Sequence, residues 1–120
     1  MLYRRIRPEL SKELASKLKS SASTRRTWVG SKLNVLIPSQ IRALRLRRNL
    51  SQKQLADLCG MKQSRISMME TPGANLSIQT LVRIAAALGI GLQVNFASFQ
   101  ELLDWENAYS QDSFDVEKLR

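Results

Sequence analysis

The sequence predicts a mostly α-helical protein, and three observations lead to this prediction. Apolar residues recur at intervals of three and four in several segments, which is the period of an amphipathic helix. Serines stand before some of these segments and glycines after them, at the places where helices are capped. Hydrophobic residues make up 43% of the 120 residues and aromatic residues only 6%, a balance that suits a core of aliphatic helices better than an aromatic-rich β-sandwich.

The chain begins with a predicted basic extension, residues 1–34, that contains one helix. Residues 1–7 are basic and have no period, and Pro8 can open a helix at its first turn. One face of this helix carries leucines that recur every four residues: Leu10, Leu14 and Leu18. The helix can dock on the core with a solvated basic face, contact the DNA backbone or bind a partner, and the sequence leaves these roles open.

The secondary structure of the next segment is ambiguous up to a helix that is expected to begin near Pro38. Residues 24–34 can form a helical turn or a loop that Trp28 pins in place. Because the residue before a proline is restricted towards extended conformations, residues 35–37 are expected to be extended, with a helix beginning near Pro38. Four arginines make that helix basic, and three apolar residues are available to the core: Ile41, Leu44 and Leu46.

Residues 51–70 predict two short helices joined by a tight turn. Ser51 can cap the first helix, because its hydroxyl can accept from a backbone N–H one turn further on. Gly60 stands where the end of that helix needs a left-handed residue. The second helix, expected over residues 62–70, opens with basic, amide and hydroxyl side chains. Two helices at a steep angle, the second with a polar first turn, form the layout of a helix-turn-helix.

A core helix, a strand and a last helix are predicted after this motif. Ser77 caps the core helix, which has a broad apolar face. Residues 92–96 alternate apolar and polar as a strand does, and a lone strand needs a partner, most simply the same strand of a second copy. Ser98 caps the last helix, and an acidic tail over residues 110–120 follows. The expected core residues from the motif onwards are Leu55, Ile66, Met69, Ile78, Leu81, Ile84 and Leu88.

The charge of the chain is positive and unevenly placed. The formal net charge is +9 and the pI about 10.5, so a polyanionic partner is expected. Residues 1–48 hold 13 Lys and Arg against 2 Asp and Glu, whereas residues 49–120 hold 6 against 8. The chain therefore has a basic front, a nearly neutral middle and an acidic end.

Composition also excludes several classes of function. With no histidine and a single cysteine, Cys59, the chain offers no zinc finger, no histidine-based acid–base catalysis and no intrachain disulfide. Since the sequence also lacks a phosphate-binding loop, a paired-carboxylate cleft and a metal cluster, we expect no enzyme, no cofactor and no metal site. No stretch approaches the ~18 apolar residues of a membrane span, and the expected compartment is the cytoplasm.

The residues of the predicted motif resemble a known family. The resemblance is to the phage-repressor/Cro-type helix-turn-helix family, also called the XRE family, and it is carried by Leu50-Ser51-Gln52, Leu55-Ala56, Gly60, Ile66 and Glu70. It spans residues 41–88 and implies a five-helix, repressor-like domain that binds double-stranded DNA. We place this domain at residues 35–91, and residues 1–34 lie outside the part that is common to the family.

The resemblance also implies roles for individual side chains. Gln63 and Ser64 would reach base edges, with Lys62 and Arg65 beside them, and Gln52 would bind a phosphate and brace Gln63. The implied DNA-binding residues are Gln52, Lys62, Gln63, Ser64, Arg65 and Ser67. Two further positions pair with each other in the family and would fix the angle between their helices, Arg45 and Glu70. For Met68 the sequence leaves two roles open, a contact with a thymine methyl group and a place in the core.

Residues 89–96 look like a subgroup that includes the DNA-binding antitoxins of toxin–antitoxin pairs. In that subgroup a strand pairs between subunits, and here it would comprise Leu92, Gln93, Val94, Asn95 and Phe96. Residues 92–120 would then supply a dimerisation strand, a short helix and the acidic tail. We expect a sequence-specific transcriptional regulator, a repressor or autoregulator, that acts as a homodimer on a palindromic site. The alternative is an antitoxin or adaptor that neutralises a toxin-like partner encoded in the same operon.

Overall fold

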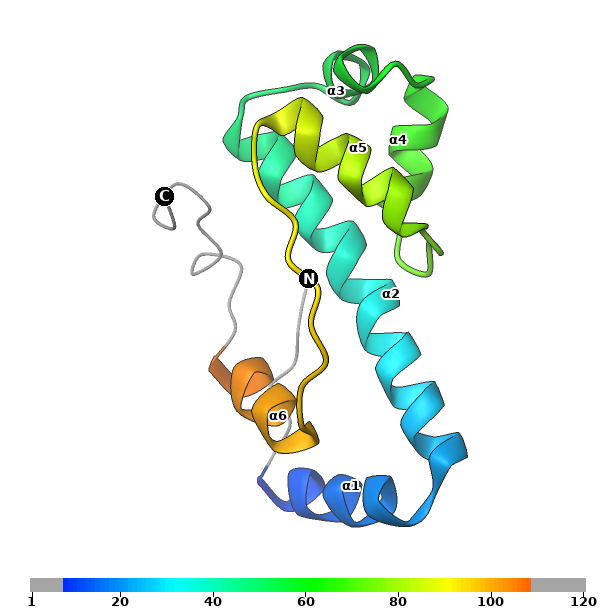
Figure 1. The fold of residues 1–120 in the computed structure, drawn as a ribbon, viewed down its shortest axis with the longest axis vertical. Coiled ribbons are helices and arrows are strands. Elements are labelled where there is room, and N and C mark those ends of the chain that lie inside the picture. The colour runs from blue at the N-terminus through cyan, green and yellow to red at the C-terminus, as the bar shows by residue number, and fades with distance from the viewer. Residues whose placement is uncertain (1–7, 109–120) are drawn as a thin grey trace. The chain divides into compact units, whose positions relative to one another are not determined.

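The structure is a computed structural model that describes the backbone of residues 8–108 and the side chains of residues 12–102, 104 and 105. Within these residues the chain is mostly helical, as expected (Figure 1). The helices are α1 (Pro8–Ser20), α2 (Ala22–Arg47), α3 (Gln52–Cys59), α4 (Gln63–Met69), α5 (Ile78–Leu88) and α6 (Phe99–Ala108). The described residues divide into two compact units, one formed by residues 30–93 and the other by residues 8–29 and 94–108. The predicted acidic tail, residues 110–120, lies outside the described residues.

The predicted strand over residues 92–96 is not present. Residues 91–98 are irregular, and no strand occurs anywhere between residues 8 and 108. A strand requires a neighbouring backbone to pair with its N–H and C=O groups, and residues 8–108 of one copy offer none to this segment. The helix count also differs from the expectation, because the unit formed by residues 30–93 contains four helical segments, the second part of α2 and α3 to α5, and not five.

Helix α2 is much longer than expected, because it does not begin near Pro38 but at Ala22. Pro38 lies inside the helix and is almost completely buried. A proline has no N–H to donate to the carbonyl four residues before it, which here is that of Asn34. The backbone N–H of Gly73 donates to this Asn34 carbonyl at 2.9 Å. The turn that follows α4 thus supplies the hydrogen bond that the proline cannot make, and the helix passes through Pro38 without an unsatisfied carbonyl at Asn34.

Gly73 makes this contact with a φ of 93°, a conformation that favours glycine. We expect Gly73→Ala to lower the free energy of unfolding by about 1–2 kcal/mol, because a side chain at this φ strains the backbone. An added Cβ would meet no atom within 4 Å, so a steric clash would not contribute. Gly91→Ala is the matched control, since that Cβ also meets open space and its φ lies outside the left-handed range. Urea denaturation measures both variants, and equal stabilities would contradict the prediction.

The core of the unit formed by residues 30–93 is aliphatic. Its buried apolar residues include Ile41, Ala43, Leu44, Leu55, Ala56, Cys59, Ile66, Met69, Ile84, Ala85 and Leu88. Three expected core residues differ from this pattern: Leu81 is only half-buried, Leu46 is 48% exposed and Ile78 is 62% exposed. Thr80 takes the inward position near the start of α5 instead. Its hydroxyl has hydrogen-bond partners there, so a polar residue can occupy a buried place at low cost.

The second unit contains α1, all of α6, and the first turns of α2. Leu18 of α1 is buried, and Arg25 Nη1 donates to its carbonyl at 2.7 Å, which satisfies a group at the end of that helix. The Trp28 ring meets Phe99 of α6 edge to face, with ring centroids 5.8 Å apart. The segment around Trp28 is therefore helical, one of its two expected conformations. No helix in the described part of the chain is long and apolar enough to cross a membrane.

Candidate nucleic-acid interface

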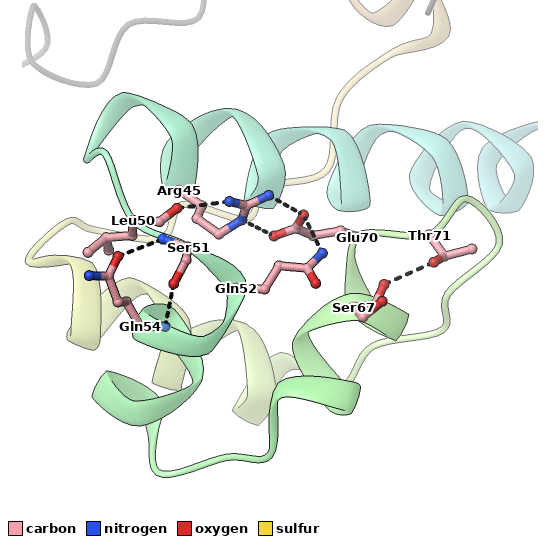
Figure 2. Close-up of polar contacts among 8 residues, drawn as sticks. All are labelled: Arg45, Leu50, Ser51, Gln52, Gln54, Ser67, Glu70 and Thr71. Carbon is pink, nitrogen blue, oxygen red and sulfur yellow. Dashed lines mark hydrogen bonds and ion pairs between the residues drawn. The ribbon is translucent and has the colours of Figure 1, made fainter.

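Helices α3 and α4 are joined by a turn whose geometry follows from local sequence. Ser51 Oγ accepts from the Gln54 N–H at 3.0 Å, and Gln54 Oε1 accepts from the Ser51 N–H at 2.8 Å, so a full capping box opens α3 (Figure 2). Gly60 ends the helix at a φ of 67°, and the N–H of Met61 donates back to the Ala56 carbonyl at 2.9 Å. This turn lets α4 start with only three residues between it and the end of α3.

A bidentate ion pair ties the end of α4 to α2 (Figure 2). Arg45 Nε donates to Glu70 Oε2 at 2.6 Å, and Arg45 Nη2 donates to Glu70 Oε1 at 2.9 Å. The two side chains are only 10% and 4% exposed, so the pair is shielded from water. Arg45 Nη1 also donates to the Leu50 carbonyl at 2.8 Å. The hydrogen bond to Glu70 raises the pKa of Arg45 above its ordinary value, against the opposing effect of burial. This pair holds the two helices together just beyond α4.

Gln52 has a different partner from the expected one. Its Nε2 donates to Glu70 Oε1 at 3.3 Å, so in this structure it braces the ion pair and not Gln63 (Figure 2). The physical reason is charge, because a carboxylate is a stronger acceptor than the amide of Gln63. Gln52 is half-buried in this position. The same side chain therefore couples the start of α3 to the residue that follows α4.

The polar residues of α4 lie on its outward face. The opposite side of the helix packs on the core, and the Arg45–Glu70 ion pair fixes its C-terminal end. With about 100° of rotation per residue, the buried Ile66 and Met69 define the inner side, and Ser64 and Met68 lie opposite them. Gln63 and Ser67 then lie on the Glu70 side of this face. All of the outward residues are exposed. Met68, at 52% exposure, does not serve as a core residue.

Arg65 lies on the other edge of the same face, next to α5. Its Nη2 donates to Thr80 Oγ1 at 3.2 Å. Arg83, one helical turn further along α5, donates through Nη2 to the Cys59 carbonyl at 2.7 Å and so also helps to end α3. An open hollow with a mixed basic and apolar lining lies between α4 and α5, bordered by Gly60, Met61, Lys62, Ser64, Arg65, Met68 and Arg83.

Two residues of this region, Thr80 and Arg83, were not singled out from the sequence. Arg83 had a detectable signal, since it is the single basic residue in the apolar segment that forms α5. Thr80 had none, because a threonine in the first turn of a helix is unremarkable until its partner is known. Cys59 is buried beside Arg83, and burial raises the pKa of its thiol while the positive charge of Arg83 opposes that rise. The thiol is therefore a small core group.

The residues of the expected dimer strand lie in the irregular segment between α5 and α6. Leu92, Val94 and Phe96 are all exposed there. Between residues 91 and 97 the structure shows one local hydrogen bond, which Asn95 Nδ2 donates to the Phe96 carbonyl at 3.4 Å. Three large apolar side chains on one short segment are thus exposed, Leu92 at 43% and the other two at 70% or more.

Comparison with known proteins agrees with this geometry. Residues 41–95 match the model of a helix-turn-helix family. This part of the chain is similar to a helix-turn-helix domain. The match begins in the last turns of α2, includes α3, α4 and α5, and ends inside the irregular segment, so the ion pair and the exposed face of α4 both lie within it. No curated protein matches the chain.

Proposed function

We propose that the protein is a transcriptional regulator of the XRE type that binds a palindromic site in double-stranded DNA as a homodimer and acts as a repressor or autoregulator. One observation carries the proposal: α4 presents exposed amide, hydroxyl and basic side chains outward, while Ile66, Met69 and the Arg45–Glu70 pair hold its inner side. An exposed polar helix on a rigid support is what direct reading of a major groove requires.

Within this proposal the side chains of α4 divide by their position. Gln63, Ser64 and Met68 occupy positions from which a helix in the major groove reaches base edges, the amide pairing with adenine and the thioether contacting a thymine methyl group. The exposure of Met68 supports the contact with a thymine methyl group over a place in the core. The basic residues of the chain supply affinity for phosphates, since the formal net charge is +9.

The homodimer is supported by large apolar side chains that are exposed to solvent in the single chain. Ile78 and Val82 are exposed one turn apart on α5, and they form an apolar stripe on the surface of the domain. Leu92, Val94 and Phe96 are exposed as well. A second copy would cover such groups and would place two α4 helices about 34 Å apart, facing successive major grooves.

The test is selection of DNA fragments from a random pool by the purified full chain, followed by sequencing. We expect a palindromic motif with half-sites one helical turn apart, and a loss of affinity of about 10³-fold or more between 50 and 200 mM salt if six or more cations meet phosphates. Gln63→Ala is expected to lose about tenfold in affinity and to relax one position in each half-site.

Three results would contradict parts of this proposal separately. A pool without any enriched motif would exclude sequence-specific binding. A mass of one chain in light scattering, with a single asymmetric half-site, would exclude the homodimer. Stable co-purification with a neighbouring gene product, without DNA binding, would favour the alternative function as an antitoxin or adaptor.

A further inference from the structure

Arg65 is held by a buried hydroxyl on a different helix. Its Nη2 donates to Thr80 Oγ1 at 3.2 Å, and Thr80 is only 6% exposed. Thr80 is itself fixed, because its backbone N–H donates to Ser77 Oγ at 3.2 Å and the two hydroxyls share a hydrogen bond of 2.9 Å. The N-cap of α5 therefore builds a rigid acceptor for one corner of the Arg65 guanidinium.

This contact orients a group whose remaining donors stay exposed. A guanidinium has five N–H donors, and the hydrogen bond to Thr80 uses one of them. The rest of the side chain is exposed. A long side chain that is already held in place loses less conformational freedom when it binds a ligand, and the affinity gains accordingly.

The position of Arg65 indicates which part of DNA it would meet. On α4 it lies about 100° from Ser64 and about 200° from Gln63, so it stands at the edge of the outward face and not at its centre. Lys62 and Arg83 border the same open hollow, which makes this edge positive. The rims of a major groove are lined by phosphates, whereas base edges lie at its floor.

We propose that Thr80 is a positioning residue, whose hydroxyl holds Arg65 as an anchor for a backbone phosphate at the α5 side of the groove. This inference rests on the proposed function, because it assigns a partner to one side chain of the same interface. Thr80 itself does not touch DNA. It acts by fixing the direction from which the guanidinium approaches the phosphate.

The test is a double-mutant cycle on DNA binding with the selected site. Thr80→Val keeps the shape of the side chain and removes the acceptor, Arg65→Ala removes the anchor, and Thr80→Ser keeps a hydroxyl. We expect Arg65→Ala to weaken binding on all sequences alike and to lower the magnitude of the slope of log affinity against log salt by about 0.9 for each of the two copies bound. We expect Thr80→Val to weaken binding about fivefold in the wild-type background and not at all in the Arg65→Ala background. Thr80→Ser and the surface control Gln79→Ala should bind as the wild type does.

Each outcome of this cycle has a definite meaning. Binding is measured at a temperature at which circular dichroism finds every variant folded, so that a loss of stability does not imitate a loss of contact. If Thr80→Val binds like the wild type, or loses as much affinity without Arg65 as with it, the inference is wrong. If Arg65→Ala changes the preference at one base pair and leaves the salt slope unchanged, the phosphate contact is wrong. In these cases the wild type still binds its site, whereas failure of the wild type to bind any site would contradict the proposed function itself.

Discussion

Glu70→Gln is expected to lower the free energy of unfolding by about 3 kcal/mol, because it leaves the buried charge of Arg45 without a counter-charge. Arg45 is tied to Glu70 through both Nε and Nη2, and the two side chains are almost completely buried. The substituted amide has the same shape and can still accept one hydrogen bond, so the change removes charge and very little volume. Urea denaturation followed by circular dichroism measures the effect.

The matched control is an ion pair of the same domain that lies in solvent. Lys53 Nζ and Asp57 Oδ2 are 3.6 Å apart on α3, and their side chains are 71% and 67% exposed. Asp57→Asn is expected to change the free energy of unfolding by no more than about 0.5 kcal/mol, because water and salt screen such a pair. Similar losses for the two variants would show that burial does not set the strength of the Arg45–Glu70 pair.

Ile66→Ala is expected to lower the free energy of unfolding by about 2–5 kcal/mol, since Ile66 is completely buried and its removal leaves a cavity behind α4. Met68 stands two residues away on the outward side of the same helix. Met68→Ala should therefore change stability by less than about 0.5 kcal/mol. Thermal and urea denaturation of the two variants give the comparison.

The same two variants distinguish a residue that supports α4 from one that we propose contacts DNA directly. Met68→Ala should weaken binding to the selected site while the protein stays as stable as the wild type. Ile66→Ala, measured well below its unfolding transition, should bind in proportion to its folded fraction. Equal stability of the two variants would mean that the inner and outer sides of α4 have been wrongly assigned.

Much of the motif could be predicted from neighbouring residues alone. Ser51, Gly60 and Ser77 all occupy the caps expected for them, because a cap depends on groups within one turn of the chain. The inward side of α4, formed by Ile66 and Met69, followed from the helical period. The resemblance to a family added Arg45 and Glu70, which are 25 residues apart and which the structure places within hydrogen-bond distance.

The errors have a common physical origin in contacts between distant residues. From the sequence, Pro38 favoured the start of a helix. In the structure the helix continues through it, because Gly73, 35 residues later, donates to the Asn34 carbonyl. Ile78 fitted the apolar period, but it is exposed, and Thr80 takes the inward position because its hydroxyl finds hydrogen-bond partners there. Residues 92–96 had the alternation of a strand, yet alternation does not supply a partner.

The sequence by itself determined the helical class of this protein, the capped turn between α3 and α4, and the polar character of the helix that we propose to read DNA. These features depend on interactions along a single turn of backbone, where spacing in the sequence equals spacing in space. Only the tertiary structure decided which side chains support that helix: Glu70 with Gln52 behind one edge, and Thr80 with Arg65 at the other. The physical reason is that a buried polar group takes the best acceptor or donor within reach, and reach is set by packing and not by sequence distance.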